Sequence, residues 1–331
     1  MTMILKRRRA LKAIAAAGAA LAAPTVVRAQ DTLDSLKILV GFPAGGSADV
    51  VSRQVADRLV PAYVRSALVD NRPGAAGRIA IDVLKTSPPD GRTLLLTPAS
   101  TVTVYADIYR NLSYNPMTDL APVSLAATFT HGLAVGPMVP ADVKTLAQFG
   151  AWCKANHDKA SCGNPGEGSF PHFLTLVLAK ALGAPIQPVP YRGGAPAMAD
   201  VLAGQLAAVM LPDSGFLAQA RENKIRVLAT SGATRSPFYP DVPTFAEQGV
   251  KELVVTEWFG FFAPPATPPA LIARASDAIG KVLGTPAMAE TFAKLGMVAK
   301  ASTPAALATL ISTEAAIWGP IIRATGFKPL E

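Results

Sequence analysis

One stretch constrains the fold more than any other: within Lys37–Leu59, a short apolar run, a glycine-rich loop and a helical pattern follow one another. The run Ile38–Val40 predicts a buried strand, and the apolar residues that recur from Val50 to Leu59 predict a helix. A strand that leads through such a loop into a helix leaves backbone N–H groups unpaired at the helix N-terminus, where the helix dipole favours negative charge. The loop Phe42–Asp49 is therefore a candidate anion-binding site.

The glycine spacing of this loop argues against a nucleotide site. Gly41, Gly45 and Gly46 do not follow the G-x-G-x-x-G pattern of dinucleotide-binding folds, and no Gly-Lys-Ser/Thr of a P-loop follows them. A glycine pair also occurs where a strand simply needs a tight connection to a helix. From this loop alone, an anion site and a tight turn both stay open.

The first 30 residues carry most of the excess positive charge. Six of the 31 basic residues and none of the 23 acidic ones lie there, so without this segment the formal charge of +8 falls to about +2. A nearly balanced chain gives no reason to expect a nucleic-acid partner.

The same segment has the order of an export signal. A basic start precedes an alanine-rich run, residues 13–23, that is too short to span a bilayer, and Val27-Arg28-Ala29 is a small-x-small cleavage pattern. We predict a signal peptide over residues 1–29. The run Arg7–Lys12 resembles a twin-arginine signal, and general secretion is the alternative. No later stretch reaches about 18 uninterrupted apolar residues, so we expect a soluble periplasmic protein.

Strands and helices alternate along the rest of the chain. Apolar runs such as Thr93–Thr97, Ile186–Tyr191 and Ala207–Leu211 are separated by helical patterns, which predicts an α/β fold with mainly parallel sheets flanked by helices. Ligands of such sheets bind beyond the carboxyl ends of the strands. The loop at 41–49 and the loop at 97–101 should therefore lie side by side.

The pattern starts again in the middle of the chain. A second glycine-rich loop, Gly163–His172, opens another predicted helix. We expect residues 132–253 to form a second lobe and residues 30–131 and 254–331 to form the first. Each lobe would present a helix N-terminus to a shared cleft, and two such ends suit a carboxylate better than one.

The chain has two cysteines, Cys153 and Cys162. In an oxidising compartment they could form a disulfide, and two free thiols are the alternative. His157 lies between them, but two cysteines and one histidine without a fourth ligand are a weak zinc pattern, so we expect no metal site and no cofactor.

Several segments together resemble the Bug family, the extracytoplasmic solute-binding receptors of tripartite tricarboxylate transporters. These segments cover nearly all of the chain after the signal, in the family's order. They are GFPAGGSAD (Gly41–Asp49), VDNRPGAAG (Val69–Gly77), PDGRTLL (Pro89–Leu95), VPYRGGAP (Val189–Pro196) and PDVPT (Pro240–Thr244).

The resemblance implies a two-lobed periplasmic-binding-protein fold of type II, whose cleft closes on a small carboxylate-bearing ligand, and inner-membrane transporter subunits as partners. It also implies that the loop after the first strand holds the carboxylate through backbone N–H groups and ordered water. The expected ligand-binding residues are Phe42, Pro43, Ala44, Gly45, Gly46, Ser47, Asp49, Thr97, Ser100, Gly168, Ser169, His172, Tyr191 and Asp213.

The second-lobe loop departs from the family pattern. Family members commonly have Gly-Ser-x-Gly followed by His, whereas here Ser169 is followed by Phe170, Pro171 and His172. Pro171 removes a backbone N–H and Phe170 adds bulk. We therefore expect a ligand that differs in size or polarity from the usual small dicarboxylates.

Several of these residues have an alternative structural role. In the first turn of its helix, Asp49 would be stabilised by unpaired N–H groups, whereas in the cleft it would repel an anion. Ser47 and Ser169 either cap their helices or donate to a ligand. His172 either stabilises a helix start or contacts the ligand.

Near the second lobe's strand ends, Tyr191 and Arg192 could line the cleft, although an arginine there usually pairs with a carboxylate such as Asp200 or Asp213. Facing the cleft, Asp213 would accept an ammonium group and favour an amino acid or amide, while a helix cap or a hinge hydrogen bond is its alternative role.

A periplasmic Ser/His hydrolase is the alternative function. The serines at 47, 100, 169 and 214 have only His131, His157 and His172 as candidate bases, and no Gly-x-Ser-x-Gly motif occurs. Only Ser169 and His172 are near each other. A ligand-sensing accessory subunit with the same cleft is a third hypothesis. We expect a monomeric receptor for a small organic acid or an amino-acid-like ligand, with no catalytic activity.

Overall fold

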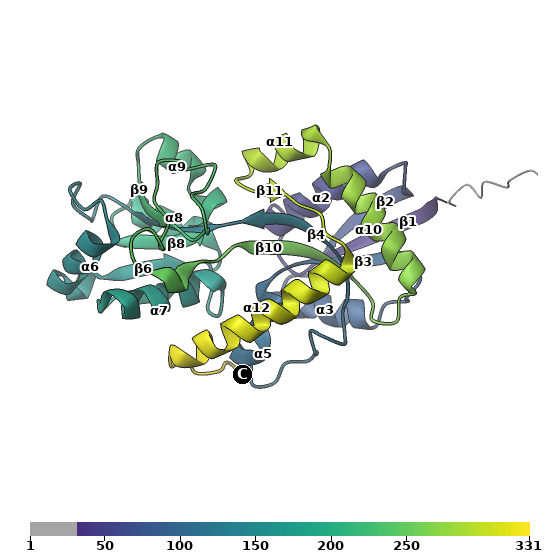
Figure 1. Ribbon diagram of the computed structural model, residues 1–331, viewed down its shortest axis with the longest axis horizontal. Coiled ribbons are helices and arrows are strands. Elements are labelled where there is room, and N and C mark those ends of the chain that lie inside the picture. Colours follow the sequence, from purple (N-terminus) through teal and green to yellow (C-terminus); the bar gives the residue numbers. More distant parts are fainter. Residues whose placement is uncertain (1–31) are drawn as a thin grey trace, which may run out of the picture. The chain divides into compact units, whose positions relative to one another are not determined.

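The computed structural model describes residues 32–331 of this chain, and the predicted export signal lies outside these residues. Leu33–Glu331 form one compact unit that contains two β-sheets. Figure 1 shows both sheets flanked by helices.

The first sheet has six strands in the order β11-β4-β10-β3-β1-β2. Strand β1 pairs in parallel with β2 and with β3, and the remaining pairs are antiparallel. The strands are β1 (Leu33–Val40), β2 (Val64–Asn71), β3 (Thr93–Pro98), β4 (Ala121–Phe129), β10 (Glu257–Ala263) and β11 (Val298–Ala299).

The second sheet has five strands in the order β7-β6-β8-β5-β9. Strand β6 pairs in parallel with β7 and β8, while β5 is antiparallel to β8 and to β9. The strands are β5 (His131–Val135), β6 (Ser161–Asn164), β7 (Gln187–Pro190), β8 (Ala208–Pro212) and β9 (Arg226–Thr230).

The two-sheet α/β architecture confirms the predicted fold class, but the prediction of mainly parallel sheets is wrong. The chain passes between the sheets directly from β4 into β5, and again between β9 and β10. Strands β4, β5 and β10 run against their neighbours, so both sheets are mixed. The first sheet takes its strands from 33–129 and 257–299, and the second from 131–230. The residue boundaries of the two lobes stay a prediction.

Helices cover both faces of each sheet (Figure 1). They are α2 (Ser47–Leu59), α3 (Arg78–Lys85), α4 (Ser100–Thr103), α5 (Tyr105–Ile108), α6 (Leu146–Ala155), α7 (Phe170–Leu182), α8 (Gly194–Leu202), α9 (Leu217–Arg221), α10 (Pro269–Leu283), α11 (Pro286–Lys294) and α12 (Pro304–Ala324).

Strand alternation divides the core into clusters on opposite faces of the sheets. Ile38 and Val40 pack with α2, α10 and α11, while Leu39, between them, packs on the opposite face with α3 and α12. The cluster around Leu39 continues into the second sheet, where it includes α6 and α7. The opposite face of the second sheet packs in a separate cluster with α8 and α9. The sheets therefore share a core on the side of α7 and α12 only.

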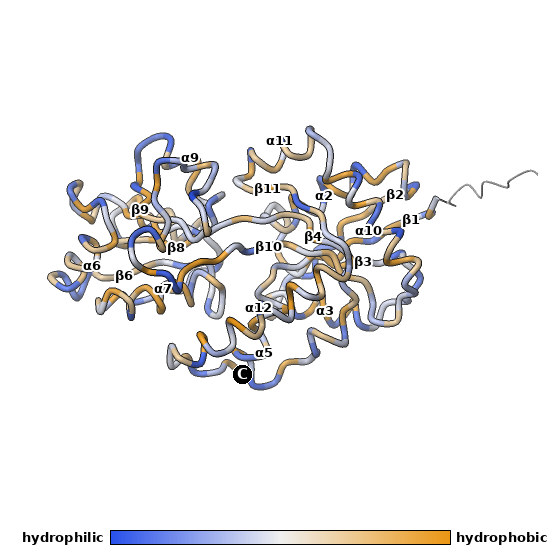
Figure 2. The backbone as a smooth tube through the Cα atoms, viewed as in Figure 1, coloured by the Kyte–Doolittle hydropathy of each residue, from blue (hydrophilic) through white to orange (hydrophobic). Residues whose placement is uncertain are grey.

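Helix α12 is long and apolar enough to cross a membrane by length and composition, and Figure 2 shows hydrophobic residues recurring along it. It buries Leu307, Ile311, Trp318 and Ile322 in the shared core. Packing in the shared core therefore accounts for these four apolar residues.

The C-terminal segment is tied to α5 and α7. Leu330 donates its N–H to Ile108 O over 2.7 Å and accepts from Arg110 N over 3.0 Å. The ring of Phe327 packs edge-on against His172 and Phe173, with centroids 5.5 and 5.1 Å away. Phe327 and Leu330 are thus half-buried and pack against the shared core.

The two cysteines are free and fully buried. The disulfide that was one of two predicted outcomes is therefore absent. Cys153 lies on α6 and Cys162 on β6, where Thr175 Oγ1 donates to Cys162 Sγ over 3.7 Å. Burial raises the pKa of each thiol to about 12.

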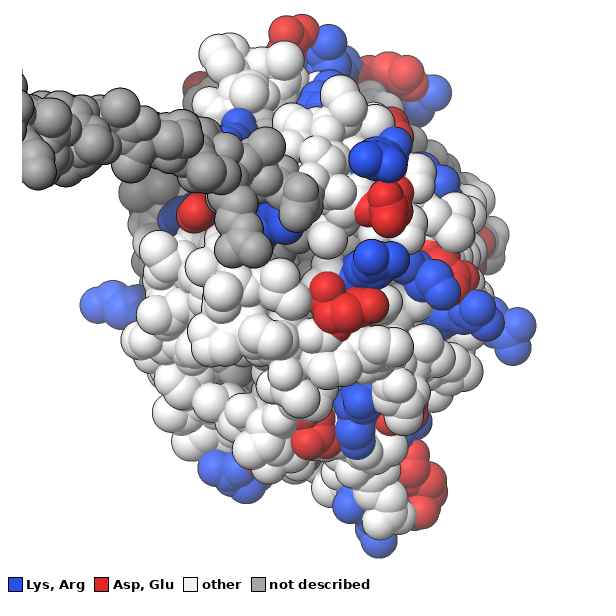
Figure 3. All heavy atoms as spheres, turned by 90° about the vertical axis from the view of Figure 1, so that its right-hand side faces the viewer, with Lys and Arg blue, Asp and Glu red and all other residues white. Residues whose placement is uncertain are grey.

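Basic and acidic residues are interspersed on the face shown in Figure 3. This face has no extended area of one sign, which agrees with the near balance of charge outside the first 30 residues.

Candidate functional site

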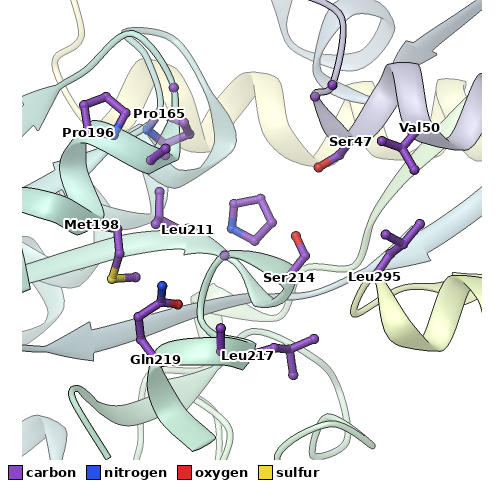
Figure 4. A pocket seen from close by; sticks show the side chains of 18 of the residues that line it. Ser47, Val50, Pro165, Pro196, Met198, Leu211, Ser214, Leu217, Gln219 and Leu295 are labelled. Carbon is purple, nitrogen blue, oxygen red and sulfur yellow. The ribbon is translucent and has the colours of Figure 1, made fainter. Parts of the chain in front are cut away.

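An open cavity of about 990 Å³ lies on the side where the two sheets do not share a core. Figure 4 shows Ser47 and Val50 of α2 on one side, Pro196 and Met198 of α8 on the other, and Ser214 between them. The cavity walls thus come from both sheets' helices and loops, which is where a receptor of two lobes would hold a ligand.

The N-terminus of α2 faces this cavity through Gly45, Gly46 and Ser47. Val50 is the first residue of α2 whose N–H is bonded to the preceding turn, at Gly46 O over 3.0 Å. The N–H groups of Ser47, Ala48 and Asp49 have no partner within 32–331. Unpaired donors and the positive end of the helix dipole favour an anion at this point.

Asp49 stabilises the loop instead of facing the cavity. Its buried carboxylate accepts from Gly45 N over 2.9 Å, from Arg53 Nε over 3.0 Å and from Asn71 Nδ2 over 3.0 Å. Burial alone would raise the pKa of Asp49, but these hydrogen bonds and the charge of Arg53 lower it overall. The loop therefore carries its own paired charge, which leaves less repulsion toward an anionic ligand.

Three basic residues lie on other walls of the cavity: Arg192 before α8, Arg221 at the end of α9 and Lys294 at the end of α11. Lys294 Nζ is 2.8 Å from Glu290 Oε1, on the same helix. No described residue forms an ion pair with Arg192 or Arg221, so the predicted pairing of Arg192 with a neighbouring carboxylate is wrong. Among the described residues that line the cavity there is no Asp or Glu.

Most of the remaining wall is apolar, and it includes Val50, Met198, Leu211, Leu217 and Leu295. A cavity that combines an apolar wall with a few cationic and N–H groups suits an organic anion with a hydrocarbon body.

Of the expected ligand-binding residues, the structure brings Gly45, Gly46 and Ser47 to this cavity. Loops 41–49 and 97–101 lie at one edge because β1 and β3 are paired neighbours. Thr97 Oγ1 is 2.9 Å from Thr101 Oγ1, and both are buried. The expected residues that do not line the cavity are Phe42, Pro43, Ala44, Asp49, Thr97, Ser100, Gly168, Ser169, His172, Tyr191 and Asp213.

The second-lobe loop lies against the shared core. Ser169 Oγ accepts from His172 N over 3.4 Å as the cap of α7, and His172 Nδ1 accepts from Gly168 N over 3.0 Å. Phe170 packs edge-on against Trp318 with centroids 4.9 Å apart. Burial lowers the pKa of His172. This loop is therefore held by its own hydrogen bonds and by α12.

Tyr191 and Asp213 are also engaged within the protein. Tyr191 Oη donates to Asp200 Oδ2 over 2.6 Å. Asp213 is fully buried, and its Oδ2 accepts from Thr130 Oγ1 over 2.5 Å. Burial raises the pKa of Asp213. Asp213 is thus hydrogen-bonded to Thr130, between β4 and β5. Ligand contact by Tyr191 or Asp213, and a hinge role for Asp213, stay predictions.

The cavity is also lined by four residues that were not predicted from the sequence to line it: Arg221, Lys294, Ser214 and Gln219. Gln219, Arg221 and Lys294 lie on helices and not in a glycine-rich loop, so no local pattern distinguished them, whereas Ser214 lies two residues after the end of β8. Arg192 was recognisable from its place in the segment VPYRGGAP.

Comparison with known proteins now identifies the family. The profile described as "Tripartite tricarboxylate transporter family receptor" matches residues 51–327. This chain belongs to that family. It is 33% identical over 329 residues to Protein BugT of Bordetella pertussis, with 98% of this chain and 99% of that protein covered. The Bug-family resemblance is therefore confirmed.

Two solved structures share the fold. "R. palustris Rpa4515 with adipate" has a TM-score of 0.82 at 26% identity, covering 90% of this chain and 99% of that one. "Structure of periplasmic binding protein BugD" has a TM-score of 0.79 at 27% identity, again covering 90% and 99%. Like these neighbours, this receptor-family chain has the periplasmic-binding-protein architecture.

Proposed function

We propose that this chain is a periplasmic receptor that binds a small organic anion in the cavity between its two sheets. It delivers this ligand to inner-membrane subunits of a tripartite transporter, acts as a monomer and catalyses no reaction. Membership of the receptor family, and the adipate named with one structural neighbour, support this function.

One observation carries the proposal for this particular site. The unpaired N–H groups at the start of α2 and the side chains of Arg192 and Arg221 line one cavity, and no carboxylate is among its described lining residues. An anion on α2 could reach the guanidinium groups when the sheets approach. Ligand contacts with both sheets would then favour the closed arrangement, because a ligand shifts an equilibrium by its difference in affinity for the two states.

The lobe boundaries and the export signal are parts of the same proposal. Residues 30–131 and 254–331 form one lobe and residues 132–253 the other, which places the hinge at the two connections between the sheets. Residues 1–29 direct export.

The experiment is a thermal-shift screen of mono- and dicarboxylates, amino acids and amides, followed by calorimetry on the best compound. Binding to the folded state raises the melting temperature. Replacing Arg192 or Arg221 with glutamine should weaken binding by about 10- to 100-fold, since a hydrogen bond to a charged group contributes about 1.5–3 kcal/mol. Arg65→Gln, an exposed arginine on β2 away from the cavity, is the matched control. Equal affinity in all three variants would refute this site.

The hydrogen bonds of Ser169 and His172 argue against the alternative function, a Ser/His hydrolase. The Ser169 hydroxyl donates to Gly166 O over 2.6 Å, and His172 Nδ1 is occupied by Gly168 N–H. Incubation with simple esters and amides should show no turnover. Turnover that is lost in Ser169→Ala would contradict the receptor proposal.

A further inference from the structure

The side chains of Asp49, Arg53 and Asn71 form a closed ring of hydrogen bonds between α2 and the end of β2. The Asp49 carboxylate accepts from Arg53 Nε over 3.0 Å and from Asn71 Nδ2 over 3.0 Å. Arg53 Nη2 donates in turn to Asn71 Oδ1 over 3.1 Å, which closes the ring. Arg53 Nη2 also lies 2.9 Å from Asp49 Oδ1, and the Asp49 side chain is only 3% exposed. Each of the three side chains is therefore held by the other two.

Asn71 connects this ring to the loop that faces the cavity. It is the last residue of β2, in register with Val40 at the end of β1. Its Nδ2 also donates to the main-chain oxygen of Phe42 over 3.1 Å, so both of its N–H bonds are used. Asp49 Oδ2 holds the loop at a second point by accepting from Gly45 N over 2.9 Å. The ring thus fixes one backbone acceptor and one backbone donor of the loop.

The ring acts from outside the cavity. None of its three side chains is among the lining residues, whereas Gly45, Gly46 and Ser47 are. A carboxylate in the first turn of α2 would by itself offset the positive end of the helix dipole. In the ring this carboxylate is paired with a guanidinium group. The unpaired N–H groups at the start of α2 therefore keep their attraction for an anion.

We propose that Asn71 is a positioning residue of the anion site. It does not touch the ligand. It fixes Asp49 and the Phe42 carbonyl, and through them the direction of the unpaired N–H groups at the start of α2. A binding group that is already held in its bound arrangement loses less conformational freedom when the ligand arrives, so the affinity is higher. Arg53 completes the ring and neutralises Asp49. This inference rests on the proposed receptor function, since it concerns how that site binds an anion.

The test compares two Asn71 variants with the unmodified mature chain. Asn71→Ala removes the amide from the ring. Asn71→Asp keeps the size of the side chain and an acceptor for Arg53, but it places a second carboxylate beside Asp49. The matched control is Asn111→Asp, at an exposed asparagine that does not line the cavity.

Nuclear magnetic resonance of the loop amides measures its order without any ligand. In the unmodified protein and in Asn111→Asp, the Gly45 N–H should be protected from exchange with solvent, because it is bonded to a carboxylate. In both Asn71 variants this N–H should exchange about tenfold faster, and the cross-peaks of Gly46 and Ser47 should shift or broaden.

Sodium acetate at constant ionic strength is the probe for anion binding. Its dissociation constant, measured from the amide shifts of Ser47 and Ala48, should rise about tenfold in Asn71→Ala and further in Asn71→Asp. It should stay the same in Asn111→Asp. Melting temperatures of all four proteins show whether a variant is merely less stable.

Unchanged exchange at Gly45, or an acetate affinity that is unchanged in both Asn71 variants, would overturn the proposal even if the melting temperature falls. An unmodified protein that binds no acetate would count against the proposed function, and the exchange at Gly45 would still decide whether Asn71 positions the loop.

Discussion

Replacing Glu314 with glutamine should make the stability of this protein much less dependent on pH. The ordinary pKa of a glutamate is 4.5, and burial beside Glu257 raises that of Glu314 to about 7 in the folded chain. Between these values the folded state binds a proton that the unfolded state has lost, so the free energy of unfolding falls as the pH rises. The free energy of unfolding falls by about 1.4 kcal/mol for each pH unit of this interval, and by about 3 kcal/mol in total.

Urea unfolding from pH 4.5 to 8.5 measures this effect. The loss should develop between pH 4.5 and about 7 and then level off, because above pH 7 both states are ionised. Glutamine does not ionise, so Glu314→Gln should not show this pH-dependent loss of stability. The free energy of unfolding of the variant, relative to that of the unmodified protein, should therefore be about 3 kcal/mol higher at pH 8.5 than at pH 4.5. Glu290→Gln should not show this gain, because Lys294 lowers the pKa of Glu290. A difference between Glu314→Gln and the unmodified protein that is the same at pH 5 and pH 8 would refute the reasoning.

Three further predictions concern the loops and the thiols. Asp49→Asn should weaken anion binding and lower the melting temperature. The reason is that the loop loses the charge of Asp49 and that the hydrogen bonds from Gly45 and Arg53 weaken. Calorimetry measures the affinity, and thermal melts measure the melting temperature. Ser169→Ala should cost about 1 kcal/mol of stability through the lost helix cap, measured by urea unfolding, and should leave anion affinity nearly unchanged. Cys153 and Cys162 should react with a thiol reagent only after denaturation, since both are buried with the pKa of each raised to about 12; rapid labelling of the native protein would contradict this.

The first glycine-rich loop, a candidate anion site, was predictable because its sequence pattern is local. An apolar run, a pair of glycines and a helical pattern are all contained in Lys37–Leu59, and the structure places β1, the loop and α2 in that order. Local propensity and tertiary structure agree there, so no information from distant residues is needed.

The other walls of the cavity were not predictable in this way. Arg221 and Lys294 come together only because α9 and α11, which lie far apart in the sequence, face one cavity. The second glycine-rich loop looked equivalent to the first, but Phe170 anchors it beside Trp318. A sequence pattern shows that a helix begins, whereas the packing of a neighbouring helix decides which way its first turn faces.

The prediction of mainly parallel sheets was wrong for a related reason. Alternating strands and helices are typical of parallel sheets, but β4 and β10 also connect two sheets and therefore run against their neighbours. The sequence of either strand does not show that it connects two sheets. This role depends on which strands it pairs with, and that is decided by the fold of the whole chain.

The attachment of the C-terminus has a practical consequence for anyone who wishes to turn this receptor into an optical sensor. Leu330 pairs with the backbone at Tyr109, and Phe327 packs against His172. A fluorescent protein joined at Glu331 would therefore disturb these contacts. The exposed turn Pro88–Asp90 between α3 and β3 is a better insertion point, since loop tips with few contacts tolerate added domains.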